Sequence, residues 1–242
     1  MNDLYYHVPD KIAWASEEIF ERSNEFKDLK KIDENFRGEK RLPIEIILDT
    51  SSYMHSGEKM DVLNKQINSF VSMLKGDFRT RVTVDVGVIT MGGKSPQIVR
   101  PLETVDSLCL HQIYEAKGCA LFGCALRMAV NEITSRKVFY IYHNIEYYRP
   151  IVILLSAGCP SDYQGNIIQD SRIIRKYVDF VKKKTDEKIC IFFTGYIGED
   201  NNARNIMKSL ASRIKNEIYF CDSYDNNEYI EKVIRRQIFP YS

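Results

Sequence analysis

The chain alternates between short apolar runs and longer segments in which apolar residues recur every three or four positions. Residues 42–49 and 151–156 are almost continuously apolar, and the first run ends in an acid. Runs of this kind are typical of strands that are covered on both faces, as in a parallel sheet. Residues 81–90 alternate and are rich in β-branched side chains, which predicts another strand. We therefore expect a sheet whose central strands are buried on both sides.

The same pattern predicts the remaining elements. Apolar residues at helical spacing predict helices at residues 60–76, 121–133, 167–184, 203–214 and 227–238. Further strands are predicted at residues 189–196 and 217–221, and at residues 96–102, where a glycine turn brings the chain back antiparallel. Residues 138–148 are too aromatic and irregular to assign. Strands that alternate with helices predict an α/β fold in three layers, a doubly wound and mostly parallel central sheet with helices on both faces and one antiparallel edge strand.

The first 40 residues are more polar and charged than the rest of the chain. Ile12, Ala15, Ile19 and Phe26 lie at near-helical spacing there, which predicts an amphipathic helix packed on the main body. The sequence RGEKR at residues 37–41 indicates an exposed connector. We expect residues 1–40 to form a helical or extended N-terminal extension and residues 41–242 to form one α/β domain.

Composition and charge exclude some kinds of partner. Hydrophobic residues make up 44% of the chain and charged residues 28%, and the net charge of +1 gives no general attraction to nucleic acid or to an anionic membrane. No secretory signal is visible at the N-terminus, and no apolar stretch approaches the roughly 20 residues that span a bilayer. The six cysteines are scattered without a C-x-x-C pair, as expected for reduced thiols. We expect a cytoplasmic protein that binds neither nucleic acid nor membrane.

Three polar loops follow predicted strands or precede a predicted helix, and ligands of parallel sheets bind beyond the carboxyl ends of the strands. The segments that contain them read LPIEIILDTSSYM at residues 42–54, ALFGCALR at residues 120–127 and PIVILLSAGCPSD at residues 150–162. In order and spacing these segments resemble the von Willebrand factor type A family, closest to its bacterial TerY-like branch. The resemblance covers roughly residues 40–240 and implies the same α/β architecture.

The resemblance implies a place for a metal ion, because the family holds Mg²⁺ in these loops with serine and threonine hydroxyls and aspartates. Asp49 and Ser51 match the first two ligands of the family. Three other ligand positions are altered: Tyr53 replaces the second serine, Ala120 the threonine and Ala157 the second aspartate. Alanine offers no side-chain oxygen, and tyrosine is too long to place its hydroxyl where serine would. We expect a degenerate site with no metal and no other cofactor, in which Asp49 and Ser51 would be the ligands of any ion that did bind.

The predicted function is a non-enzymatic protein–protein interaction module. Its binding face consists of the former metal-site positions and one acid of the third loop, namely Asp49, Ser51, Tyr53, Ala120, Ala157 and Asp162. The TerY-like resemblance suggests a kinase or phosphatase as partner, in a stress-response or conflict system. The alternative is a Mg²⁺-dependent adhesion-type domain whose rearranged shell uses Asp162, Ser52 or a backbone carbonyl.

Other sites find less support in the sequence. Cys119, Cys159 and His55 lie in loops at one end of the predicted sheet, but they lack the paired spacing typical of zinc ligands. No motif ties a histidine to Ser156 or Cys159 as in a nucleophilic enzyme. The aromatic cluster at residues 139–148 is either a cover over a sheet edge or a contact surface, and both interpretations stay open.

Overall fold

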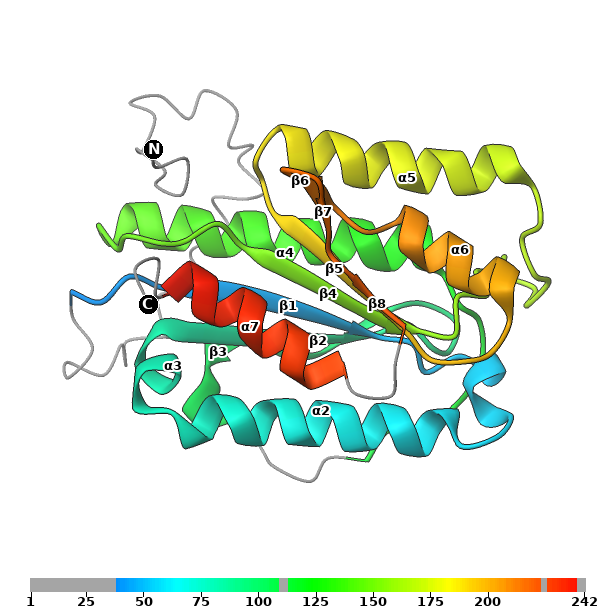
Figure 1. The fold of residues 1–242 in the computed structure, drawn as a ribbon, viewed down its shortest axis with the longest axis horizontal. Helices are drawn as coiled ribbons and strands as arrows, with labels where there is room; N and C mark the ends of the chain where they lie inside the picture. The colour runs from blue at the N-terminus through cyan, green and yellow to red at the C-terminus, as the bar shows by residue number, and fades with distance from the viewer. Residues whose placement is uncertain (1–37, 109–112, 223–225, 239–242) are drawn as a thin grey trace.

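A six-stranded, mostly parallel sheet forms the centre of the molecule (Figure 1). The computed structural model describes residues 38–108, 113–222 and 226–238. The strand order is β3-β2-β1-β4-β5-β8. The parallel strands are β1 (Leu42–Leu48), β2 (Val84–Thr90), β4 (Ile151–Ser156), β5 (Ile191–Tyr196) and β8 (Phe220–Cys221), and β3 (Gln97–Thr104) is antiparallel at one edge. The predicted fold class is confirmed, including its antiparallel edge strand.

Helices cover both faces of the sheet, which makes the three layers (Figure 1). The first face is covered by α2 (Lys59–Gly76) and α7 (Asn226–Ile238), and the second by α4 (Phe122–Tyr142), α5 (Ser171–Asp186) and α6 (Asn201–Ser209). The shorter elements are η3 (Ser52–His55), α3 (Phe78–Thr83), η4 (Val105–Ser107), and the two-stranded pair β6 (Arg213–Ile214) and β7 (Glu217–Ile218). A membrane-spanning helix needs about 20 mostly apolar residues. Each helix in the described ranges is too short or too polar for that.

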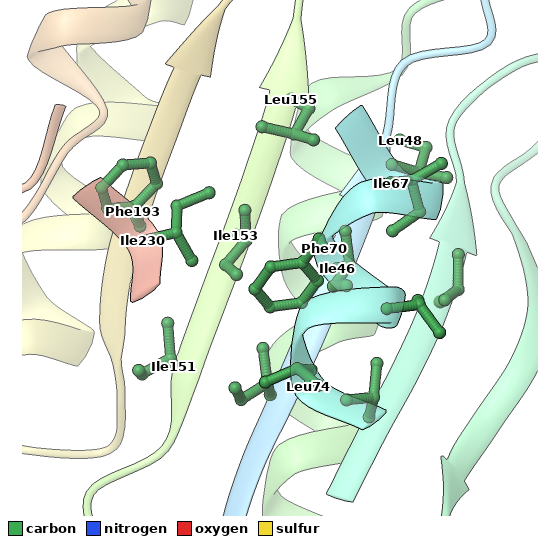
Figure 2. Packing of buried hydrophobic residues seen from close by; sticks show 14 of the residues in the cluster. Ile46, Leu48, Ile67, Phe70, Leu74, Ile151, Ile153, Leu155, Phe193 and Ile230 are labelled. Atoms are coloured by element: carbon green, nitrogen blue, oxygen red, sulfur yellow. The ribbon is translucent and has the colours of Figure 1, made fainter. Parts of the chain in front are cut away.

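Two apolar cores explain why the central strands are apolar at successive positions. Ile46 and Leu48 of β1 pack against α2 on the first face, where Phe70 also lies, whereas Ile47 joins the core beneath α4. Figure 2 shows the first core, with side chains of β1, β4 and α2 gathered between sheet and helix. Because successive strand residues point to opposite faces, a strand that is covered on both is apolar at most positions.

One predicted element is wrong in its first part. Residues 81–83 alternate like a strand but belong to helix α3, and β2 begins only at Val84. The cause is local capping, since the Asp77 carboxylate accepts hydrogen bonds from the amides of Arg79 and Thr80, at 2.8 and 3.1 Å. An N-cap of this kind outweighs the weak β propensity of so short a segment.

Other boundaries also differ from the predictions. Helix α4 continues into the first part of the unassigned aromatic segment and ends at Tyr142. Helix α5 begins four residues late, at Ser171, because Asp170 caps it, and α6 is shorter than predicted. The predicted last strand is divided, since β7 pairs with β6 and β8 with β5. The predicted helix around Ile12 to Phe26 lies outside the described residues, and the division near residue 40 stays a prediction.

A buried cluster of charged groups fastens α4 to the sheet. Asp85 of β2 is fully buried, and its carboxylate accepts hydrogen bonds from Arg41, from Arg136 and from the hydroxyl of Tyr140. The Nη2 atom of Arg136 lies 2.7 Å from Oδ2 of Asp85. Arg41 precedes β1, and Arg136 and Tyr140 belong to α4, so this cluster joins three elements around a single carboxylate.

The aromatic cluster at residues 139–148 is divided between core and surface. Phe139 and Tyr140 are buried, and Tyr147 stacks on Tyr140 with 5.6 Å between ring centroids. Tyr142, by contrast, is 70% exposed. The cover interpretation therefore holds for the first two residues, and Tyr142 is left on the surface.

Candidate binding face at the carboxyl ends of the strands

The three loops singled out in the sequence meet at the carboxyl ends of β1 and β4. The amide of Ser52 donates to the carbonyl of Gly118 at 3.0 Å, which joins the first loop to the second. The amide of Ser161 donates to the carbonyl of Ala120 at 2.9 Å, which joins the third to the second. Gly118 makes this approach possible, because it has a φ of +68° and a side chain there would overlap the backbone of Gly93.

Asp49 lies at the centre of the three loops and is fully buried. Its Oδ1 atom accepts a hydrogen bond from the amide of Ser51 at 2.9 Å, and its Oδ2 atom accepts one from the hydroxyl of Ser156 at 2.5 Å. Burial raises the pKa of Asp49, and the hydrogen bonds from Ser156, Ser51 and the Ala157 amide oppose that rise without cancelling it. Both carboxylate oxygens are thus bound by groups of the protein itself.

Ser51 supplies the second oxygen at this position. Its hydroxyl is buried and has no hydrogen bond of good geometry within the described part of the chain. The hydroxyl lies close enough to the Asp49 carboxylate to favour its ionised form. A buried hydroxyl without such a partner carries an energetic cost. Among the predicted face residues in these ranges, Ser51 is therefore the one whose side-chain oxygen lacks a hydrogen-bond partner.

The remaining positions do not complete a Mg²⁺ shell. Ala120 and Ala157 are buried, and each packs into one of the two apolar cores. The Ala120 amide donates to the Ser161 hydroxyl at 2.8 Å, which commits that hydroxyl to the backbone. Mg²⁺ requires a near-octahedral set of oxygens, and the side chains present offer one carboxylate, already hydrogen-bonded twice, and one hydroxyl. This donor set does not fit the ion that the fold family implies.

Tyr53 and Asp162 are held away from Asp49. The hydroxyl of Tyr53 donates to the carbonyl of Gly165 at 3.4 Å, so the side chain reaches across to the loop that follows β4. The Asp162 carboxylate accepts hydrogen bonds from the amides of Gln164 and Asn166, at 2.8 and 2.9 Å, within its own loop. The side-chain amide of Asn166 donates to Oδ2 of Asp162 at 3.0 Å, and together with these backbone bonds it holds the pKa of Asp162 below its usual value. The carboxylate is thus bound within its own loop.

Ser156 is the residue of this face whose role the sequence did not reveal. Leu48 of β1 and Leu155 of β4 are the last pair in register, so Asp49 and Ser156 are the next neighbours along the two segments. The signal was present as a hydroxyl at the end of an apolar strand. It becomes informative once β1 and β4 are known to be adjacent.

Metal and nucleophile chemistry based on cysteine finds no support from the geometry. Within residues 38–108, 113–222 and 226–238, no three His, Cys, Asp or Glu side chains are grouped to hold a metal ion. Burial raises the pKa of the Cys159 thiol, and the Asp49 carboxylate raises it further. A thiol held in its protonated form is a weak nucleophile.

Two large apolar side chains are exposed on the loop after β4. Tyr163 is 71% exposed and Ile167 is 44% exposed, in the segment that Tyr53 contacts through Gly165. The phenol of Tyr163 also lies 3.2 Å from the Cys124 sulfur at the start of α4. The face therefore combines a buried polar centre with an exposed, partly aromatic rim.

The comparison with known proteins is informative at the level of structure. No protein-family model matches the sequence, and no curated protein matches it. The pilus adhesin SpaC from Lactobacillus rhamnosus GG superposes with a TM-score of 0.61 at 13% identity, over 84% of this chain and 30% of the adhesin. The SpRpn10 VWA domain gives 0.52 at 14% identity, over 79% of this chain and 95% of that domain.

A protein described as von Willebrand factor type A from Catenulispora acidiphila gives a TM-score of 0.50 at 16% identity, over 82% of this chain and 43% of that one. This chain thus spans less than half of that protein and less than a third of the adhesin. The chain has the fold of a von Willebrand factor type A domain. Likeness at this level of identity establishes the fold alone, and function has to be argued from the site.

Proposed function

We propose that the chain is a non-enzymatic protein-interaction domain that binds its partner through this face without a metal ion. The observation that carries the proposal is the state of Asp49, whose two oxygens are bound by Ser51 and Ser156. Alanines stand at two positions where the family has oxygen ligands. A carboxylate of the partner would therefore find no metal ion to coordinate, and recognition has to come from direct contacts between the two proteins.

The exposed rim supplies those contacts. Tyr163 and Ile167 present apolar area beside Tyr53, and tyrosine is enriched among residues that dominate protein interfaces. In the structural relatives that are named as a pilus adhesin and a minor pilin, the domain belongs to larger proteins. We propose that the domain here presents its loops to another protein.

The finer features of the proposal rest on the sequence resemblance. The three loop segments are most similar to the TerY-like branch, and the analogy suggests a kinase or phosphatase as partner in a stress-response or conflict system. A cytoplasmic location belongs to the same proposal, and the free thiols of Cys119, Cys124, Cys159 and Cys190 suit a reducing compartment.

A second candidate is a metal-dependent adhesion-type domain with a rearranged shell. The observation in its favour is the buried Ser51 hydroxyl, which lacks a well-formed hydrogen bond in the described ranges. In this candidate, Asp49 would give up its hydrogen bond with Ser156 and bind an ion instead. Backbone carbonyls would have to supply the further oxygen ligands. We rank it second because Asp162 is bound within its own loop.

Two exposed tyrosines at opposite ends of α4 allow a matched test. Tyr163→Asp on the proposed face is expected to weaken partner binding by about tenfold or more, because it places a charge in the contact. Tyr142→Asp, at an equally exposed position where α4 ends, is expected to leave binding unchanged. Binding is measured by affinity capture from native cells, followed by titration of the recovered partner in Mg²⁺ and in EDTA.

The proposal predicts the same affinity in Mg²⁺ and EDTA. Loss of binding in EDTA would favour the second candidate instead. Equal effects of the two substitutions would show that the partner does not use this face.

A further inference from the structure

A carboxyl group without a partner lies in the middle of the sheet, away from the candidate face. Glu45 of β1 is 0% exposed, and neither of its carboxyl oxygens has a hydrogen-bond partner within the described ranges. In register it stands between Gly87 of β2 and Val152 of β4. An unpaired carboxyl group at such a place is unusual, because its ionised form is cut off from bulk water and has no cation beside it in the described ranges.

The sheet is shaped around this side chain. A Cβ atom on residue 87 would overlap the carboxyl group of Glu45. Gly87 therefore leaves the space that this carboxyl group occupies. Glu45 points to the same side as Ile47, towards α4, where Val152 and Ala129 belong to the apolar core. The carboxyl group is therefore enclosed between the sheet and α4.

In the described ranges, no cation is placed as a counterion for Glu45. The charge of Glu132 on α4 acts on it and has the same sign. Arg41 and Arg136 are bound by Asp85 of β2 instead. Asp49, which follows the end of β1, is bound by Ser156. Burial raises the pKa of Glu45 well above its ordinary value, and Glu132 raises it further.

We propose that Glu45 is a proton-binding site in the core, protonated while α4 is seated on the sheet, and that loss of its proton loosens α4. An ionised carboxylate would need water, and water reaches this position only if α4 moves away from β1 and β2. Helix α4 begins at Phe122, directly after the loop that contains Ala120, so the loosening extends to one part of the candidate face. The proposal does not depend on what that face binds.

The direction of the pH effect follows from the raised pKa. An unfolded glutamate has a pKa of about 4.3. The native state therefore keeps the proton of Glu45 at pH values where the unfolded chain has lost it. The stability linked to Glu45 is thus fully present below that pH and is lost as the pH rises through the native pKa of Glu45. One proton changes the unfolding constant by at most about tenfold per pH unit in this window.

The test joins a direct titration to an unfolding series. The Glu45 carboxyl carbon, assigned through bonds to its own backbone amide in ¹³C-labelled wild-type protein, is expected to titrate well above the ordinary glutamate range. Urea unfolding is then followed against pH for the wild type, for Glu45→Gln and for the exposed control Glu115→Gln. We expect Glu45→Gln to remove the fall in stability with rising pH and Glu115→Gln to retain it.

Hydrogen exchange locates the effect. After correction for intrinsic rates, the opening constant of α4 amides and of the Ala120 loop is expected to rise with pH in the wild type, and that of α2 to rise less. An ordinary Glu45 titration would overturn the proposal, even if Glu45→Gln fails to fold. So would an equal pH dependence in wild type and Glu45→Gln, or equal opening of α2 and α4.

Discussion

Replacing Asp85 with alanine is expected to lower the free energy of unfolding by about 3 to 5 kcal/mol, the usual cost of removing one partner from a buried ion pair. The side chains of Arg41 and Arg136 are 7% and 9% exposed, so both cations would remain buried without their shared carboxylate. The hydroxyl of Tyr140 would lose its acceptor as well. Urea unfolding at neutral pH measures the change.

The control is Asp106→Ala, which removes the exposed ion pair with Arg81, at 3.0 Å. Pairs of that kind contribute little in water, so the unfolding midpoint should move little. A small effect of Asp85→Ala, comparable with that of the control, would contradict the structural role assigned to the cluster.

Acid should remove the same contribution from the wild type. Burial alone would raise the pKa of Asp85, but the guanidinium groups of Arg136 and Arg41 lower it to about 2. An unfolded aspartate has a pKa of about 3.9, so the stability linked to Asp85 is fully present above that pH. It is lost as the pH falls through the native pKa, and this part of the acid sensitivity should be missing in Asp85→Ala.

Placing the family's ligands at the three altered positions is expected to create Mg²⁺ binding, which we do not expect of the wild type. The triple variant Tyr53→Ser, Ala120→Thr and Ala157→Asp adds two hydroxyls and a carboxylate around Asp49 and Ser51. A dissociation constant of about 1 mM or below, or about 4 kcal/mol of binding free energy, would be the expected gain. Thermal unfolding with and without Mg²⁺ measures it, because an ion that binds the folded state stabilises it.

The matched control adds Asp49→Ala to the triple variant and should abolish the stabilisation by Mg²⁺. Ala120 and Ala157 are buried, so the triple variant should also be less stable than the wild type without the ion. A triple variant that folds and still ignores Mg²⁺ would show that these loops do not correspond to the family's metal loops.

The fold was predictable because its central strands have a strong and simple signature. Strands β1 and β4 are covered on both faces, and their nearly continuous apolar runs indicate a parallel sheet between helix layers. Boundaries were less predictable, since they depend on single side chains. Asp77 starts α3 inside an apparent strand, and Asp170 delays α5.

The candidate face was predictable as a set of positions and not as a set of interactions. Asp49, Ala120 and Ala157 could be placed at strand ends from the loop order. The bond from Ser156 to Asp49 depends on β1 and β4 being neighbours, and the inward turn of Asp162 depends on backbone amides of its own loop. The lack of a partner for Glu45 could not be predicted, because it depends on Arg41 and Arg136 binding Asp85 instead.

The central claim, a binding face that works without metal, is tested most directly by calorimetric titration of the wild-type protein with Mg²⁺ and Mn²⁺, beside Asp49→Ala. We expect no binding heat from either protein, because the oxygens of Asp49 are bound by Ser51 and Ser156. Micromolar binding by the wild type that disappears in Asp49→Ala would contradict the claim.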